Sequence, residues 1–441
     1  MRQRTQERLL KTILIILTLG MIVLRFLLNE NGRVTPDSIR FMRQARVFPI
    51  IDNTTAPLLY PISLKLFSVF GGEFWASKIV GILSYLFIVI FAWKKKFYFK
   101  ESILVGGLFS FVSLYAATLS EALFFPFAFL FFYVARKIIL EEYSKIIAIF
   151  LLSLILILLF NVRYIGLFYM GGTFVFGLLN FKKSFAKIYI IASTLALLYV
   201  VGYKLLFIDT FNQNYVNQFL EIGLKPTLQL IKEFSTAIAT SFNPFIHILA
   251  PSGGIINIGI IGIGIINIAL LSILVIKNGL SATEKLVLFF SVFGLLCSFF
   301  IQYFYQTDAL DYRLLAPFTF GIWLIYFKKL HQIFGKWVYG ITLLSIVTGF
   351  TFSYLSRGNY LENRNAAKAY LTKKQLIDKK VYYYYNAKED INYNNIQIAE
   401  LLSTINPRIY VVTKGEDTLK NEVLTHYKVE SNIKINKNKF Q

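Results

Sequence analysis

The sequence predicts an all-α polytopic membrane protein with about eleven transmembrane helices, followed by a small α/β domain. Of its 441 residues, 56% are apolar and 16% charged, whereas a soluble domain carries about 25% charged residues. Apolar runs of roughly 16 to 24 residues recur from Ile13 to about Tyr354, too long and too many for buried helices of a soluble protein. A β-barrel would show short alternating segments, which this pattern does not resemble.

The predicted spans have the usual length of about 20 residues. Lys and Arg cluster in alternate short loops, for example at Lys94–Lys96 and Lys182–Lys183, and this bias predicts a cytoplasmic N-terminus. An odd number of spans then places the C-terminal tail outside, and a bacterial plasma (inner) membrane is the expected location. The predicted spans are 12–28, 74–93, 103–119, 121–136, 145–161, 164–180, 187–207, 253–276, 285–304, 313–328 and 335–354.

Two long external segments and a polar tail complete the predicted organisation. The membrane domain covers residues 1–355, with a first external loop at 29–73 and a second at 208–250. In the first loop, Thr35 is expected to cap a helix that carries Asp37 near its positive end. The Lys- and Asn-rich residues 356–441 alternate between helix-like and strand-like segments, which predicts a small extracytoplasmic α/β domain.

Charge and cysteine content narrow the classes of function. The formal charge is +22, but most basic residues of the apolar region lie in short loops, so no basic face remains for a nucleic acid. Cys297 is the single cysteine, which excludes a disulfide within the chain and a multi-thiolate metal site. The histidines also lack metal-ligand spacing. No cofactor is predicted, and a divalent metal is not indicated.

Ionisable residues recur near the outer ends of the predicted spans, at one depth and on one side. Such groups are costly near hydrocarbon and usually mark a pathway or a site. The cations suit a phosphate or pyrophosphate at the membrane surface, and a carboxylate kept ionised by arginines suits a general base. The eight residues are Arg25, Arg163, Lys204, Arg313, Asp37, Glu121, Asp308 and Asp311.

Several of these residues also have a purely structural interpretation, which stays open at this point. Arg25 and Lys204 are long enough to reach the interface from within a span. Glu121 and Asp37 each stand near an expected helix start, where the helix dipole favours an anion. Arg40 and its basic neighbours equally suit a helix face that lies on anionic lipid headgroups.

Four stretches, taken together, resemble the GT-C superfamily of integral-membrane glycosyltransferases. The likeness is to the branch of dolichyl- or polyprenyl-phosphate-mannose–protein mannosyltransferases and bacterial lipid A sugar transferases. It spans residues 12 to about 330. The matching stretches are Asp37-Ser-Ile-Arg-Phe41, Pro57-Leu-Leu-Tyr-Pro61, Leu119-Ser-Glu-Ala-Leu-Phe124 and Tyr312-Arg-Leu-Leu-Ala-Pro317.

The resemblance implies sugar transfer on the extracytoplasmic face. The donor would be a polyprenyl- or dolichyl-phosphate sugar, and the acceptor a lipid, glycan or protein. Asp37 would be the general base, and Glu121 the acid of the second loop. Ser38 stands where the family often has a glutamate, so a metal site is not expected there. The phosphate would be held by Arg163, Arg313 and Lys204, and further substrate contacts would come from Arg40, Tyr60 and Asp311.

Two rival functions stay open. An O-antigen polymerase- or ligase-like enzyme would use a diphosphate-linked oligosaccharide and need a large external loop bearing Arg and His, whereas 208–250 offers Lys225, Lys232 and His247. A transporter or flippase would place ionisable groups near the bilayer midplane and show repeated halves. The outer-end positions of the ionisable groups favour the glycosyltransferase.

Overall fold

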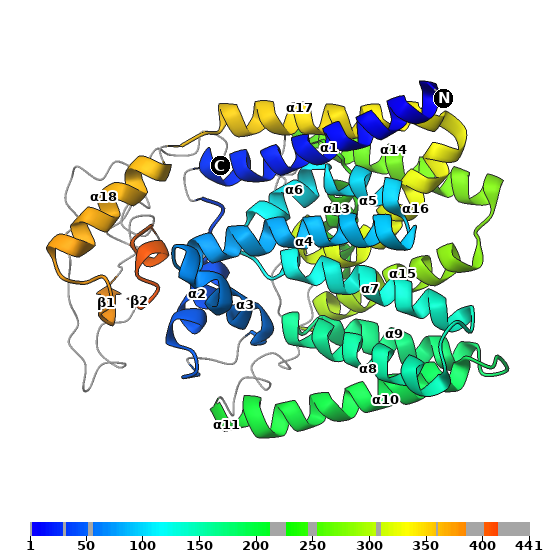
Figure 1. Cartoon of the computed structure of the whole chain (residues 1–441), viewed down its shortest axis with the longest axis horizontal. Helices are drawn as coiled ribbons and strands as arrows, with labels where there is room; N and C mark the ends of the chain where they lie inside the picture. The colour runs from blue at the N-terminus through cyan, green and yellow to red at the C-terminus, as the bar shows by residue number, and fades with distance from the viewer. Residues whose placement is uncertain are drawn as a thin grey trace.

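The computed structural model is a bundle of long helices with short helices and a two-stranded sheet at one end (Figure 1). It describes residues 2–29, 32–51, 56–211, 226–245, 254–305, 310–358, 360–384 and 401–412. Within these residues, eight helices are long and apolar enough to cross a membrane, or up to nine if one bent pair is a single span. The chain is therefore a polytopic integral membrane protein, as the sequence predicts.

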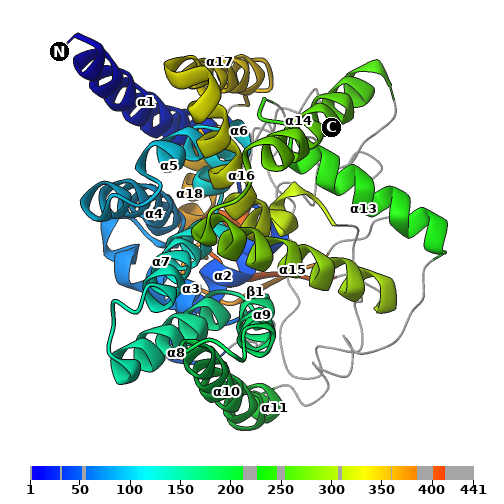
Figure 2. The same cartoon turned by 90° about the vertical axis from the view of Figure 1, so that its right-hand side faces the viewer.

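Consecutive helices of the bundle are joined by short connections and pack against one another, as α7, α8, α9 and α10 do. Figure 2 looks at the same bundle after a quarter turn. The bundle helices are α1 (Arg2–Leu27), α4 (Glu73–Lys95), α5 (Phe99–Gly106), α6 (Phe109–Ala116), α7 (Glu121–Ile139), α8 (Lys145–Val162), α9 (Gly166–Leu179), α10 (Ala186–Tyr203), α13 (Thr227–Ser241), α14 (Ile255–Asn278), α15 (Ala282–Phe304), α16 (Tyr312–Phe334) and α17 (Tyr339–Leu355).

Each of the eleven predicted spans falls on helical residues, but some of these helices are too short or too bent to cross a membrane singly. The span predicted at 103–119 is broken into α5 and α6, which are bent by 74°. The span predicted at 164–180 is α9, which has 14 residues. The last two predicted spans belong to one apolar stretch, Tyr312–Leu355, in which α16 and α17 follow each other. A hydropathy pattern detects apolar runs but not such breaks and short helices.

The second predicted external loop, 208–250, contains a helix that enters the bundle. The described part of this region includes α13, which packs against α14 and α16. The indole Nε1 of Trp323, near the middle of α16, donates to the Ser241 carbonyl at 3.2 Å, and Asn267 of α14 donates to the Phe242 carbonyl at 3.1 Å. The chain at Ser241–Phe242 therefore lies among the helices rather than outside them. Gly264 of α14 permits this close packing, because a Cβ at that position would lie 1.7 Å from the Ala239 carbonyl oxygen.

A second, smaller core lies beyond the bundle at one end, where the first loop meets the tail (Figure 1). Phe41, Tyr60 and Phe74 pack there with Tyr360 and Leu371. Residues 385–400 and 413–441 lie outside the described residues, so a complete α/β domain in the tail stays a prediction. The elements at this end are α2 (Pro36–Val47), α3 (Leu59–Phe67), α18 (Tyr360–Lys373) and the parallel pair β1 (Val381–Tyr384) and β2 (Ile409–Val412).

The bundle has two ends, the Asp37 end and the Lys96 end. The Asp37 end is the end with α2 and α3, where α7 and α16 begin at Glu121 and Tyr312. The Lys96 end is the opposite one, where α4 and α7 end. Along α7, the 15 steps from Glu121 to Arg136 span about 22 Å at 1.5 Å per residue.

Candidate functional site

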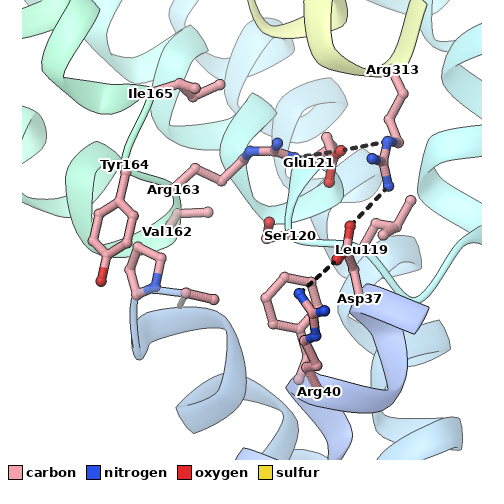
Figure 3. Close-up of a pocket in the computed structure, with 13 residues that line it drawn as sticks. Asp37, Arg40, Leu119, Ser120, Glu121, Val162, Arg163, Tyr164, Ile165 and Arg313 are labelled. Atoms are coloured by element: carbon pink, nitrogen blue, oxygen red, sulfur yellow. Dashed lines mark hydrogen bonds and ion pairs between the residues drawn. The ribbon is translucent and has the colours of Figure 1, made fainter. Parts of the chain in front are cut away.

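Five of the predicted site residues, Arg40 among them, come together in one pocket at the Asp37 end (Figure 3). Asp37 comes from α2, Glu121 from the start of α7, Arg163 from the turn between α8 and α9, and Arg313 from the start of α16. The pocket has a volume of about 200 Å³. These side chains lie up to 276 positions apart in the sequence, so the fold alone gathers them.

Asp37 owes its position to the start of α2. The Thr35 N–H donates to Ser38 Oγ at 3.0 Å, which closes the first turn, and Pro36 follows at the first helical position. Pro at this position loses no helical hydrogen bond. The carboxylate of Asp37 stays 44% exposed, so it is accessible from the pocket, and the helix dipole favours its negative charge.

Glu121 is the buried centre of the site, with a side chain only 1% exposed. One of its oxygens, Oε1, forms ion pairs with Arg163 Nη1 and, at 3.6 Å, with Arg313 Nε. A buried carboxylate is costly unless it is paired, and two guanidinium groups supply the pairing. Glu121 thereby holds Arg163 closely, and Arg313 more loosely, at the pocket wall.

Arg313 links the two carboxylates. Its Nη1 lies 3.4 Å from Asp37 Oδ2, while Arg40 Nη1 lies 3.6 Å from Asp37 Oδ1. Both distances exceed the roughly 2.7–2.9 Å of a tight charge-assisted hydrogen bond. The pairing of Asp37 is therefore loose. The pocket lining as a whole has three guanidinium groups against two carboxylates, which leaves one positive charge in excess.

Arg163 is presented by a tight turn between α8 and α9. It ends α8 in an extended conformation, and its carbonyl accepts from the Gly166 N–H at 2.9 Å. A Cβ at position 166 would lie 2.4 Å from the backbone nitrogen of Phe160. Only glycine fits this close approach, so Gly166 sets the geometry that points Arg163 toward Glu121.

The three residues proposed for substrate contacts differ in position. Arg40 lines the pocket. Tyr60 packs edge-on against Phe41, at 5.1 Å between ring centroids, and burial raises its pKa, with nearby Glu121 adding to the effect. Asp311 caps α16, where its Oδ1 accepts from the Leu314 N–H at 2.9 Å, and burial raises its pKa against the influence of Arg313.

Two of the predicted cations lie elsewhere. Lys204 forms an ion pair with Asp209 at 2.7 Å and does not line the pocket, so the structure gives it no place in the phosphate-binding group. The reason is that α10 lies at the edge of the bundle (Figure 1). Arg25 is buried over the rings of Phe109 and Phe352 and joins α1 to α17. Asp308 lies outside the described residues.

The sequence did not single out Lys78 as a site-supporting residue. It is 2% exposed, and its Nζ donates at 2.9 Å to the carbonyls of Gly32 and Ala116 and to Thr118 Oγ1. It thus ties the chain before α2 to the segment that leads into α7. Its position just inside a span, where lysine is costly, was the available signal.

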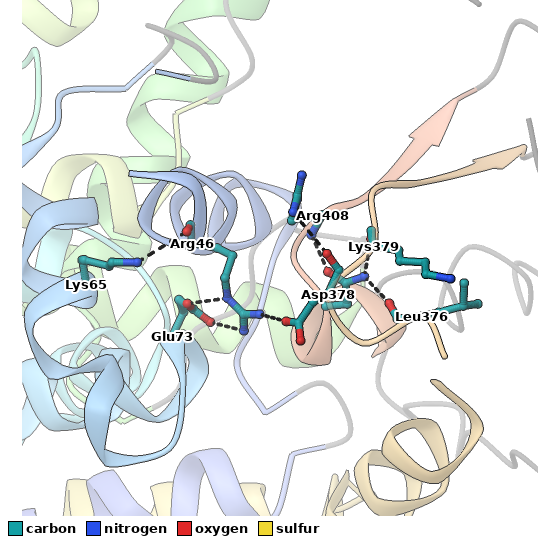
Figure 4. A network of polar contacts seen from close by, with 8 residues as sticks. Arg46, Lys65, Glu73, Leu376, Asp378, Lys379 and Arg408 are labelled. Carbon is teal, nitrogen blue, oxygen red and sulfur yellow. Dashed lines mark hydrogen bonds and ion pairs between the residues drawn. The ribbon is translucent and has the colours of Figure 1, made fainter. Parts of the chain in front are cut away.

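A second network joins α2 to the tail (Figure 4). Arg46 donates to both carboxylate oxygens of Glu73, at 2.6 and 2.7 Å, and pairs with Asp378 at 2.9 Å. The hydrogen bonds that Arg46 donates to Glu73 raise the pKa of Arg46. Arg43 also donates to the Pro407 carbonyl at 3.0 Å. The helix that carries Asp37 is therefore fixed at its far end by α4 and by the tail.

Comparison with family models, curated proteins and solved structures gives no match. Among the described residues, no three His, Cys, Asp or Glu side chains lie together as a metal site would require. The chemical content of the pocket is therefore an accessible carboxylate beside two arginines that a buried carboxylate holds in place. This set can accept a proton and stabilise an anion at adjacent positions.

Proposed function

We propose that the chain is a membrane glycosyltransferase that moves a sugar from a polyprenyl- or dolichyl-phosphate donor to a hydroxyl of a lipid, glycan or protein. The observation that carries the proposal is the meeting of Asp37, Arg163 and Arg313 in one pocket at the end of the bundle. It agrees with the resemblance of the surrounding sequence to GT-C enzymes. Such a donor needs no nucleotide site, because its leaving group is a lipid phosphate.

In the proposed reaction the acceptor oxygen attacks the anomeric carbon of the sugar. The new bond is between that oxygen and the carbon, and the bond that breaks joins the carbon to the phosphate oxygen. The acceptor proton passes to the carboxylate of Asp37. The electron pair of the broken bond stays on the phosphate, whose added negative charge Arg163 and Arg313 stabilise.

Exposure supports the division of roles between the two carboxylates. Asp37 is 44% exposed and loosely paired, so an acceptor hydroxyl can reach it. Glu121 is 1% exposed and lies against two arginines, so it positions them and does not take up the proton. A base must stand within hydrogen-bonding reach of the proton that it removes, and Asp37 meets this requirement better.

The size and depth of the pocket favour this donor over the two rivals. Its volume of about 200 Å³ is below the roughly 300–1,000 Å³ of most ligand pockets. Such a space suits one sugar and one phosphate better than a diphosphate-linked oligosaccharide. It is also built from helix starts and a turn, whereas transporter sites lie near the midplane of the bilayer.

The test is sugar transfer by the purified protein from synthetic polyprenyl-phosphate sugars to membrane lipids and glycans, read by mass spectrometry. We expect Asp37→Asn to lower the rate by about 10²- to 10⁴-fold, the usual contribution of a general base. Asp209→Asn is the matched control, because Asp209 pairs with Lys204 away from the pocket. It should transfer at the wild-type rate.

Two other outcomes would count against parts of the proposal. Equal transfer by wild type and a folded Asp37→Asn protein would keep the reaction class and remove Asp37 as the base. Absence of transfer by folded wild-type protein with several sugar donors would overturn the class, and would favour the polymerase or the transporter.

A further inference from the structure

A second and larger hollow lies at the Lys96 end of the bundle. Its volume is about 620 Å³. Helices α1, α4, α5, α7, α15 and α16 contribute to its wall. Its lining combines one carboxylate, Glu101, and a threonine with basic and aromatic side chains: Lys11, Lys96, Lys100, Arg136, Lys328, Trp93, Phe97, Tyr98 and Phe99.

The positive charge of this hollow is only partly neutralised. Lys11 and Lys100 share Glu7, at 2.9 and 3.3 Å. In the part of the chain that the structure describes, no ion pair joins Lys96 or Arg136 to a carboxylate. Three of the five lining cations therefore have a carboxylate partner, because Lys328 also pairs with Glu284 at 3.1 Å. The two remaining positive charges make this hollow a place where an anion is attracted.

The turn between α4 and α5 gives the hollow its aromatic wall. Lys96 and Tyr98 adopt left-handed backbone conformations, with φ of 49° and 47°, and the turn buries Phe97 and Tyr98. The hydroxyl of Tyr98 is buried and has no hydrogen-bond partner among the described residues. Burial raises its pKa, so the group keeps its proton and remains a donor.

An exposed tryptophan stands at the edge of the same hollow. The ring of Trp93, in the last turn of α4, is 62% exposed. Tryptophan is enriched where a membrane meets water, because its ring packs against lipid while its N–H remains hydrated. A ligand at this level would meet cations and an apolar ring together, which suits an amphiphile better than a soluble anion.

We infer that the hollow at the Lys96 end binds the phosphate headgroup of an anionic glycerophospholipid, with Lys96 and Arg136 on the phosphate and Trp93 beside the acyl chain. Basic pockets between transmembrane helices bind headgroups of this kind. The helix spacing between Glu121 and Arg136 places the site about 22 Å from the candidate active site. The inference does not depend on sugar transfer.

Lipid retention tests the site directly. Purified protein is mixed with phosphatidylglycerol or phosphatidylcholine in detergent, and bound lipid is counted by native mass spectrometry. Because each basic residue at a membrane surface contributes about 5-fold in affinity, the Lys96→Gln/Arg136→Gln variant should bind phosphatidylglycerol roughly 30-fold more weakly. The Lys94→Gln/Lys95→Gln control removes the same charge from side chains outside the lining and should retain the lipid.

The remaining outcomes overturn the inference. Equal retention of the two lipids by wild type would show lipid adsorption without recognition of an anionic headgroup. Equal loss in both double variants would show general charge attraction without a site. Equally strong binding of soluble glycerol 3-phosphate would assign the hollow to a soluble phosphate instead of a lipid. Thermal unfolding of each variant shows whether it is folded. If the double variant does not fold, the single change Lys96→Gln, on a solvent-exposed side chain, replaces it.

Discussion

The two ends of the bundle use basic residues in opposite ways. At the Asp37 end, Arg163 and Arg313 each face a carboxylate from another segment, Arg40 faces Asp37 of its own helix, and the pocket volume is about 200 Å³. At the Lys96 end, the hollow is about 620 Å³, and Lys96 and Arg136 face it without an ion pair among the described residues. The first arrangement fixes side chains in place, and the second leaves charge available.

This difference matches two kinds of task. A reaction needs donors held in advance at the point where charge develops, because reorganisation during the reaction would raise the barrier. Binding a headgroup needs net charge and tolerates several poses. Buried ion pairs add little stability on balance, so the pairs around Glu121 are better explained by positioning. Substitutions at the two ends should therefore have unequal effects.

The largest difference in stability between the two ends is expected when a glutamate of an ion pair is changed to glutamine. Glu121→Gln keeps the side-chain shape but leaves Arg163 and Arg313 without their shared anion. We expect the free energy of unfolding to fall by about 3 kcal/mol, the lower end of the effect of breaking a buried pair, since both arginines are partly exposed. Glu142→Gln at the Lys96 end breaks the exposed pair with Lys137 and should leave unfolding unchanged. Thermal and denaturant unfolding in detergent measure both.

Activity adds a second measurement to this comparison. If Glu121 positions the phosphate-binding arginines, Glu121→Gln should also reduce sugar transfer in protein that remains folded at the assay temperature. Wild-type transfer by that variant would show that the arginines keep their places without Glu121, and the two ends would then be more alike than their ion pairs indicate.

The sequence predicted the depth of a residue along the membrane normal better than it predicted which helices are neighbours in the bundle. Apolar runs locate the spans along the membrane normal, so the sequence could place Asp37, Glu121, Arg163 and Arg313 at one level, and the structure brings these four into one pocket. Hydropathy does not say which helices are neighbours. Lys204 was predicted at that level, but it begins the short helical segment Lys204–Ile208 that follows α10 at the edge of the bundle, and its partner is the local Asp209.

The long-range polar contacts could not be predicted from the sequence, for the same reason. The bonds of Lys78 to Gly32 and Ala116, and of Arg46 to Asp378, join segments that only the packed fold brings together. The capping of α2 was predictable, because Thr35, Pro36 and Ser38 are local to it. Local signals thus defined the elements of the site, and packing selected which of them meet.

Lys78 gives the next largest expected effect. Lys78→Met should fill the same space beside Phe74, over whose ring Nζ lies at 4.7 Å, but it removes the donor for three acceptors. We expect the free energy of unfolding to fall by about 2 kcal/mol, within the usual cost of buried groups left without a partner. Lys96→Met removes an exposed lysine at the other end and should change it by less than about 0.5 kcal/mol. Similar losses in both variants would contradict the comparison.

Helix caps, in contrast, should contribute equally to stability at the two ends of the bundle. Asp311 caps α16 at the Asp37 end, and Ser281 caps α15 at the Lys96 end, where it accepts from the Glu284 N–H at 3.3 Å. Each change to Ala should lower the free energy of unfolding by about 1 kcal/mol. Asp311→Asn should recover most of that loss, because asparagine caps a helix as well as aspartate does. If Asp311→Asn remains as unstable as Asp311→Ala, the charge of Asp311 beside Arg313 matters more than its cap. The ion-pair network of the Asp37 end would then extend to a sixth residue.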